Sequence, residues 1–199
     1  MAEYTKAVKI SVDRMVHLTD QLYAYASGGK YQAETVETLS VGDFVEKTMS
    51  LLSHTIDPDI CVDINLPRDI LYVKADPTQI QIVISAVITN ATEAIKGKGN
   101  IRVTCKNEII TDKTSEILSG LTPRNYVTLT ITDDGKGMDK ETAERVFEPF
   151  FSTNFMGRGL GMAAVQGIVR NHDGRISVDS ELGRGTSVKI CLPAVEKSR

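Results

Sequence analysis

Hydrophobic residues between positions 77 and 95 recur with the spacing of an α-helix. At about 100° per residue they form one broad stripe, which is typical of a helix packed on a core. Asp76 and Pro77 precede the stripe as the cap and first-turn proline of such a helix. The stripe consists of Ile80, Val83, Ile84, Val87, Ile88, Ala91 and Ile95. A long core helix is therefore predicted here.

Three later segments alternate apolar and polar residues, as strands with one buried face do. Their apolar positions are Ile101, Val103 and Cys105; Val127, Leu129 and Ile131; and Val188, Ile190 and Leu192. Another strand is predicted at residues 175–179, and a hairpin that turns at Pro67 at residues 60–65 and 70–74. Shorter helices are predicted at residues 41–54, 139–147 and 160–171, with polar loops at residues 27–40 and 111–125. Helices and strands therefore follow one another over residues 41–199.

Residues 3–26 carry apolar or small residues alternately four and three positions apart, the spacing of a bundle or coiled-coil seam. The seam consists of Val8, Val12, Met15, Thr19, Leu22 and Ala26. Because further apolar residues lie off this seam, we expect it to pack against at least one partner helix that is missing from the sequence.

Composition narrows the class of protein. With 199 residues, 41% of them hydrophobic, and a net charge of −3, the chain can form one cored domain with an appendage. No basic block indicates nucleic acid, no apolar run is long enough to span a membrane, and no signal-peptide stretch opens the chain. Cys61, Cys105 and Cys191 are widely spaced among apolar strand residues, which favours reduced core thiols over metal ligands. A cytoplasmic protein is predicted.

The candidate chemistry starts at Asp133, which ends an apolar strand face in the stretch ITDDGKGM. A carboxylate there needs hydrogen-bond donors, and an adenine amino group is a good one. Thr186 has the same parity on its own strand, so its hydroxyl is expected in the same layer. Gly135 and Gly137 allow a sharp turn and a close approach to a flat ring. The same residues also fit a plain turn after an edge strand, so both interpretations stay open.

Asn90 lies on the margin of the helical stripe, within about 20° of Val83. Asparagine is a poor residue for a helix interior, so its place there requires a partner. A magnesium ion that carries phosphates would be one such partner. An ordinary hydrogen bond to a neighbouring loop is the alternative.

In order along the chain, NATEA, DDGKGM, FEPFFST, GRGLGM and GRGT resemble the N, G1, F and G2 boxes of the ATP-binding catalytic domain of sensor histidine kinases. That domain shares a superfamily with gyrase, MutL and a heat-shock chaperone. The resemblance spans about residues 40 to 193. It implies an α+β domain over residues 41–199, a two-layer α/β sandwich of Bergerat type with ATP held between helices and a mixed sheet. It also implies that residues 1–40 are the second helix of a dimerisation and phosphoacceptor hairpin with its linker.

The resemblance assigns a role to each matching residue. Asn90 becomes the catalytic residue and magnesium ligand, and Asp133 takes the adenine amino group. Gly135 and Gly137 shape the base pocket, and the free N–H groups at the start of the 160–171 helix suit phosphate oxygens. The other residues implied to bind the nucleotide are Glu93, Met138, Ser152, Thr153, Gly157, Arg158, Gly159, Leu160, Gly161, Met162 and Thr186.

Three positions depart from the family pattern. Ala86 stands where a second asparagine is usual, Asn154 stands where a lysine is common, and no threonine precedes Leu160. Gyrase-like and MutL-like enzymes carry a glutamate general base at the position of Ala86. Since hydrolysis needs an activated water, the alanine favours phosphotransfer over hydrolysis.

Two further features concern movement and the acceptor. The FEPFFSTNFMGRG segment fits a hinged lid, and it also fits an ordinary packed loop anchored by its phenylalanines. His17 is followed by Leu18, whereas an acidic residue follows the acceptor histidine of the family. We therefore expect no phosphoacceptor in this chain.

The sequence thus predicts the catalytic domain of a sensor histidine kinase, with ATP and Mg²⁺ as cofactors. A response regulator receiver domain is the expected partner, and a homodimer is expected through the hairpin helix. The chain alone is expected not to phosphorylate itself. A non-catalytic nucleotide sensor and a gyrase-like or MutL-like ATPase stay open as alternatives.

Overall fold

A computed structural model gives the fold and describes residues 36–111, 122, 124–152 and 159–196. The structure does not describe the predicted seam at residues 3–26, His17 or residues 112–121 and 123 of the predicted loop at residues 111–125. The described elements are β1 (Glu37–Ser40), α2 (Val41–Leu52), β2 (Ile60–Asn65), β3 (Tyr72–Ala75), α3 (Pro77–Ala94), β4 (Gly99–Ile110), β5 (Arg124–Asp133), α5 (Lys140–Arg145), α6 (Gly161–Asn171), β6 (Arg175–Glu181) and β7 (Gly185–Val195).

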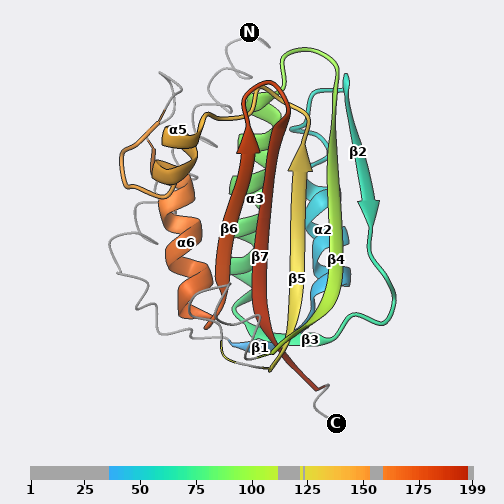
Figure 1. The fold of residues 1–199 in the computed structure, drawn as a ribbon. Coiled ribbons are helices and arrows are strands. Elements are labelled where there is room, and N and C mark those ends of the chain that lie inside the picture. Colours follow the sequence, from blue (N-terminus) through green and yellow to red (C-terminus); the bar gives the residue numbers. More distant parts are fainter. Residues whose placement is uncertain (1–35, 112–121, 123, 153–158, 197–199) are drawn as a thin grey trace, which may run out of the picture.

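The strands form one mixed sheet in the order β1-β3-β7-β5-β4-β2, with β6 paired to β7. β2 runs parallel to β4, and the other described pairs are antiparallel. Figure 1 shows α2 and α3 behind the sheet, with α6 on the side of β6 and α5 near the upper end. The register places Asp133 opposite Thr186, so the shared parity predicted for them is confirmed.

The larger of two hydrophobic clusters among the described residues joins the helices to one face of the sheet. It combines residues such as Val45 of α2, Ile84 of α3 and Val165 of α6, none of which is exposed, with Ile101 and Ile131 of the central strands. The predicted stripe of α3 is buried as expected. The α+β class and the two-layer sandwich are therefore confirmed.

Hydrogen bonds of polar groups hold the start of α3 and the end of α6 together. The Asp76 carboxylate accepts hydrogen bonds from the N–H groups of Thr78 and Gln79, at 2.8 and 3.1 Å, and so caps α3 as predicted. The Asp76 N–H donates to Nε2 of His172 at 3.1 Å, and the other ring nitrogen of His172 lies 2.8 Å from the Ile168 carbonyl oxygen. His172 thereby joins the end of α6 to the start of α3.

The predicted hairpin of residues 60–65 and 70–74 is wrong. Both segments contain strands, but β2 pairs with β4, whereas β3 pairs with β1 and β7 on the other side of the sheet. Alternation of apolar residues predicts a strand but not the strand with which it pairs. Pro67 lies in the connection between β2 and β3 and not in a hairpin turn. The predicted loop at residues 27–40 also ends in a strand, β1.

Smaller differences concern lengths and burial. Helix α2 ends two residues before the predicted boundary, and α5 is shorter than predicted. Cys105 and Cys191 are buried, but Cys61 is exposed, so the prediction of a core thiol is wrong for Cys61. Its strand lies at the edge of the sheet, where alternate residues point to solvent. No helix in the described ranges is long and apolar enough to cross a membrane.

Candidate nucleotide-binding site

Asp133 lies at the end of β5 with only 6% of its surface exposed. Its carboxylate accepts a hydrogen bond from the Gly135 N–H at 2.9 Å. Burial raises the pKa of this carboxyl, the N–H groups of Gly135 and Thr186 lower it in part, and the charge of Asp134 raises it further. The pKa lies above its ordinary value of 3.8 because these donors offset only part of the lost hydration. An ionised carboxylate has about four lone-pair sites on its two oxygens, so two N–H donors leave room for a further donor from a ligand.

Thr186, opposite Asp133, belongs to a small hydroxyl network. Its hydroxyl lies 2.9 Å from the Ser180 hydroxyl, which accepts from the Met138 N–H at 2.9 Å and donates to the Gly185 carbonyl at 3.0 Å. Ser180 was not predicted from the sequence. Its role depends on the pairing that places it opposite Thr186 in the β6–β7 pair, which no local pattern shows.

The two predicted glycines of the turn are required by the protein itself. A Cβ atom on Gly135 would lie 2.7 Å from the backbone of Ala94, at the end of α3. Gly137 has a φ of +61°, and its Cβ would lie 2.0 Å from the Glu181 carbonyl oxygen. The turn after β5 is therefore wedged between α3 and the β6–β7 hairpin. This close packing is a reason for glycine that the expected approach to a flat ring did not anticipate.

The same turn is tied to the rest of the sheet by Asp134. Its carboxylate accepts from the backbone N–H and the side-chain amide of Asn100, at 2.7 and 2.6 Å. These bonds lower the pKa of Asp134 below its ordinary value, the backbone bond having the larger effect. The Lys136 N–H donates to the Ala94 carbonyl at 3.0 Å, which holds the turn against α3. Asp134 and Asn100 are positioning residues that were not predicted from the sequence, because the pattern of alternating residues indicated Asp133 alone.

Asn90 and Glu93 lie on the exposed side of α3, near the helix end that the turn contacts. The Asn90 side chain is exposed and makes no hydrogen bond with any other described residue. Its amide oxygen is therefore available to a ligand, and the alternative of a bond to a described loop finds no support. Ala86, one turn earlier, is 2% exposed and belongs to the core.

The start of α6 offers backbone donors. Leu160 is the N-cap, and among the described residues no side chain caps the helix, so the first N–H groups have no described side-chain acceptor. The side chains of Leu160 and Met162 are buried. The Leu160 carbonyl accepts from the Ala164 N–H at 2.9 Å, so the groups offered to a ligand are the backbone N–H groups of this first turn. Gly159 has a φ of +65°, and its carbonyl accepts from the Phe150 N–H at 2.9 Å.

Part of the predicted phosphate-binding set falls elsewhere. Ser152 is exposed at the end of the described segment. Thr153, Gly157 and Arg158 lie outside the described residues, as does the part of the predicted lid from residue 153 to 158.

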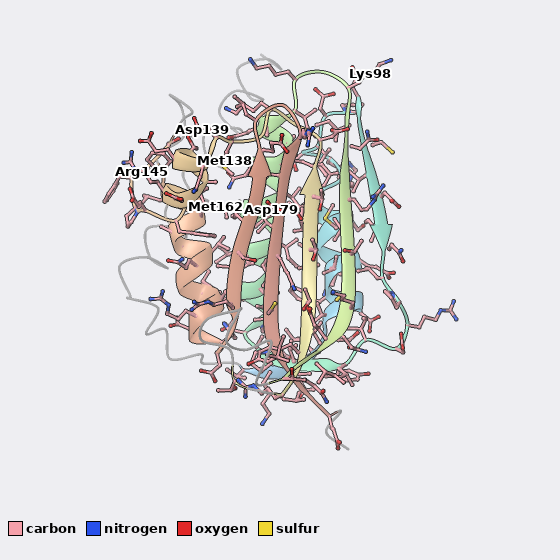
Figure 2. All side chains as sticks on the ribbon, in the orientation of Figure 1. Lys98, Met138, Asp139, Arg145, Met162 and Asp179 are labelled. Atoms are coloured by element: carbon pink, nitrogen blue, oxygen red, sulfur yellow. The ribbon has the colours of Figure 1, made fainter. Side chains whose placement is uncertain are left out.

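The structure brings several of the predicted residues to one end of the molecule. Figure 1 shows the C-terminal end of β5 at the upper edge of the sheet, and in Figure 2 Met138 and Asp139 lie between α5 and the upper end of β6. Met138 and Asp139 also line a groove of about 600 Å³ between α5 and β6. A buried acceptor, an exposed amide and an uncapped helix N-terminus suit an adenine, a magnesium-bound phosphate and a free phosphate respectively. The residues present therefore fit Mg-ATP. No group of three histidine, cysteine or acidic side chains within the described ranges is placed to hold a metal unaided.

The chain is similar to known ATPases and sensor kinases. Residues 75–196, more than half of the chain, match the family described as histidine kinase-, DNA gyrase B- and HSP90-like ATPases. Sensor kinase CckA of Brucella abortus is 33% identical over 195 residues, which cover 96% of this chain and 20% of that protein. Sensor histidine kinase ZraS of Salmonella typhimurium is 31% identical over 166 residues, covering 83% of this chain and 33% of that protein. The chain thus spans a fifth to a third of these curated relatives.

Solved structures agree on the fold. The mycobacterial sensor histidine kinase MprB superposes with a TM-score of 0.66 at 23% identity, covering 82% of this chain and all of that one. Full-length ShkA, solved in complex with AMPPNP, gives a TM-score of 0.76 at 21% identity and covers 99% of this chain and 39% of that one.

Proposed function

Because the chain belongs to the family of histidine kinase-, DNA gyrase B- and HSP90-like ATPases, we propose that it is the catalytic domain of a sensor histidine kinase. In this role it binds Mg-ATP and transfers the γ-phosphoryl group to a histidine of a dimerisation hairpin. A response regulator then receives the phosphoryl group. The two curated relatives described above are named as sensor kinases, which supports this branch of the family.

The observation that carries the proposal is the buried carboxylate of Asp133. It lies between the N–H groups of Gly135 and Thr186 at the end of a central strand, and burial raises its pKa. Burying a carboxylate in this way is costly, and carboxylates with pKa values shifted by burial cluster at functional sites, which supports a ligand contact at this position. An adenine amino group donates to it, and the firmly packed turn holds the carboxylate in place for that contact.

Asn90 is the proposed magnesium ligand. Its exposed amide oxygen is free of other described partners, and it lies near the helix end that packs on the turn carrying Asp133. When bound, Mg²⁺ would neutralise phosphate charge during in-line transfer. The uncapped N–H groups of α6 orient the phosphates, and its positive dipole end favours their negative charge.

Phosphotransfer is favoured over hydrolysis by Ala86. The residue is buried in the core, so no carboxylate at this position activates a water. Transfer to histidine needs no such base on α3, because the acceptor nitrogen is itself the nucleophile. In a gyrase-like ATPase the same position would hold a glutamate.

The partners follow from the same assignment. The ThkA kinase has been solved in complex with the response regulator TrrA, which supports a receiver domain as the partner of this chain. The seam predicted at residues 3–26 supports a homodimer formed through the hairpin helix. A cytoplasmic location is part of the same proposal.

Phosphorylation of a supplied acceptor tests the proposal. The chain is incubated with γ-labelled ATP, Mg²⁺ and a hairpin carrying the acceptor histidine, and acid treatment then removes phosphohistidine but spares phosphoserine. Acid-labile label on the hairpin, transferred slowly because the acceptor is untethered, is the expected result. The chain alone should remain unlabelled.

Two outcomes contradict the proposal. Nucleotide binding without any labelled hairpin indicates a non-catalytic sensor, and phosphate release at the same rate without a hairpin indicates an ATPase. Acid-labile label on the chain alone that disappears in His17→Ala would overturn the prediction that this chain lacks an acceptor.

A further inference from the structure

We propose that the open edge of β2 and the groove beside it form a docking surface for an extended segment of another protein, one that alternates apolar and basic side chains. The surface is defined by β2 together with Glu46, Met49, Ile56 and Asp57. It is separate from the nucleotide site, and Figure 1 shows β2 at the right-hand edge of the sheet, on the side away from α6.

The first observation is the unpaired strand edge. Within the described part of the chain β2 pairs with β4 alone, over all six of its residues. In a parallel pair, alternate residues direct both of their backbone groups toward the partner, so the others direct theirs outward. A free edge of this kind is a ready template for another strand.

The second observation is the apolar groove beside this edge. It has a volume of about 570 Å³ and lies between α2 and β2, lined by Met49, Ile56, Val62 and Ile64 among others. Along β2 the inward residues rise out of the core, from 7% exposure at Ile60 to 40% at Ile64. An added strand would place alternate side chains over these residues, because directly paired residues have Cβ atoms about 4.5–5.5 Å apart. A bound strand would therefore need an apolar side chain at every second position to fill the groove.

The third observation is the charge around the groove, which selects the occupant. Glu46 and Asp57 line it, and Asp59 and Asp63 are exposed at the start and middle of the edge. Only Asp63 has a described ionic partner in this group, Arg102 at 3.2 Å. Two copies joined edge to edge would bring these acidic groups together, which disfavours self-pairing. A strand with basic side chains between its apolar ones would place them on the face of β2 that carries Asp63, and its net positive charge would also complement Glu46 and Asp57 at the groove.

Binding of a synthetic peptide tests the surface. A fluorescein-labelled peptide of sequence KVKIKVKIK is titrated with the full chain and its anisotropy measured. A peptide in which proline replaces valine keeps the charge but cannot pair as a strand, and one in which glutamate replaces lysine reverses the charge. We expect binding of the first peptide alone.

Variants locate the binding. The double variant Glu46→Lys with Asp57→Lys should weaken binding by about tenfold, and Ile64→Lys should weaken it to a similar extent. Matched controls are Glu141→Lys with Glu144→Lys on the exposed surface of α5, and Leu51→Lys, an exposed apolar residue that does not line the groove. The controls should leave the affinity unchanged.

Cys61 provides an independent readout at the edge itself. It is exposed on β2, whereas burial raises the pKa of Cys105 to about 12 and also raises that of Cys191. A thiol reagent should therefore modify the native chain at Cys61, and the peptide should slow this reaction.

Four results would overturn the proposal: equal binding of the proline peptide, an unchanged affinity in the groove variants, no binding at all, or a Cys61 thiol that is already protected without peptide. The last would mean that residues 1–35 or a second copy cover the edge. Nucleotide binding takes no part in these measurements, so their failure leaves the proposed function intact.

Discussion

Replacing Asp133 by asparagine separates recognition of the base from stability of the fold. The side chain keeps its shape and one oxygen, which can still accept from the Gly135 N–H. Its amide group then meets the adenine amino group as a second donor, so one buried polar group is left badly paired. Such a group costs about 1–3 kcal/mol, and we expect a loss of about fivefold to 150-fold in affinity for ADP.

The ligand-free protein should respond differently. Because burial raises the pKa of Asp133, the charged form is destabilised by the fold, and its replacement by a neutral amide relieves this cost. We expect the thermal midpoint of Asp133→Asn to equal or exceed that of the wild type. Loss of binding with an undiminished midpoint would be the signature of a residue held for a ligand.

Asp134→Asn is the matched control, since the same chemical change is made at the next residue. The Asp134 carboxylate is exposed and bonded to Asn100, so we expect a small loss of stability, about 0.5–1.5 kcal/mol, and nearly unchanged affinity for ADP. Calorimetry with ADP and thermal unfolding of both variants provide the comparison. Equal affinity in the wild type and Asp133→Asn would refute the assignment of the adenine contact.

Three further predictions address the rest of the site. Asn90→Ala should abolish Mg²⁺-dependent phosphotransfer with little change in the thermal midpoint. Thr89→Ala, a change at the exposed neighbouring residue, should leave phosphotransfer active. A large fall in the thermal midpoint of Asn90→Ala would show that Asn90 has a structural role. Gly137→Ala should lower the free energy of unfolding by at least about 2 kcal/mol because of its left-handed backbone and the clash with Glu181, whereas Gly42→Ala, which has open space around it, should be neutral or stabilising. On acidification, affinity for ADP should fall at a higher pH than stability does; simultaneous loss of both would contradict this.

The order of these two acid transitions follows from opposite pKa shifts. The pKa of Asp133 is raised above its ordinary value of 3.8, so this carboxylate becomes protonated at a higher pH than a free aspartate. Its protonation favours the folded state and removes the acceptor for the adenine amino group. The pKa of Asp134 is lowered, so its contribution to stability is present above 3.8 and is lost as the pH falls through its lower folded value. Affinity and thermal midpoint measured across the same acidic range would reveal the order.

Local patterns in the sequence were sufficient for most elements of the fold. The stripe of α3, the cap at Asp76 and the alternation in β4, β5 and β7 each follow from residues a few positions apart, and all are present in the structure. The pairing of β2 with β4 joins residues far apart in sequence, so no local pattern contained it. The exposure of Cys61 depends on that pairing and was missed for the same reason.

The candidate site likewise combines features that local sequence predicts with features that depend on strand pairing. The parity of Asp133 and Thr186 could be read from alternation, because both strands are regular up to the paired residues. The Ser180 network and the bonds from Asn100 to Asp134 could not, since each depends on which strands become neighbours. Gly135 and Gly137 were predicted to make room for a ligand, whereas their close contacts are with Ala94 and Glu181 of the protein itself.

A crystal structure with Mn²⁺ in place of Mg²⁺ and a non-hydrolysable ATP analogue tests the central claim most directly, because anomalous scattering locates the metal independently of the protein. The predicted result is an adenine amino group within hydrogen-bond distance of the Asp133 carboxylate, phosphates at the start of α6, and the metal signal beside the Asn90 amide oxygen. A nucleotide bound away from Asp133, or a metal with no contact to Asn90, would contradict the account.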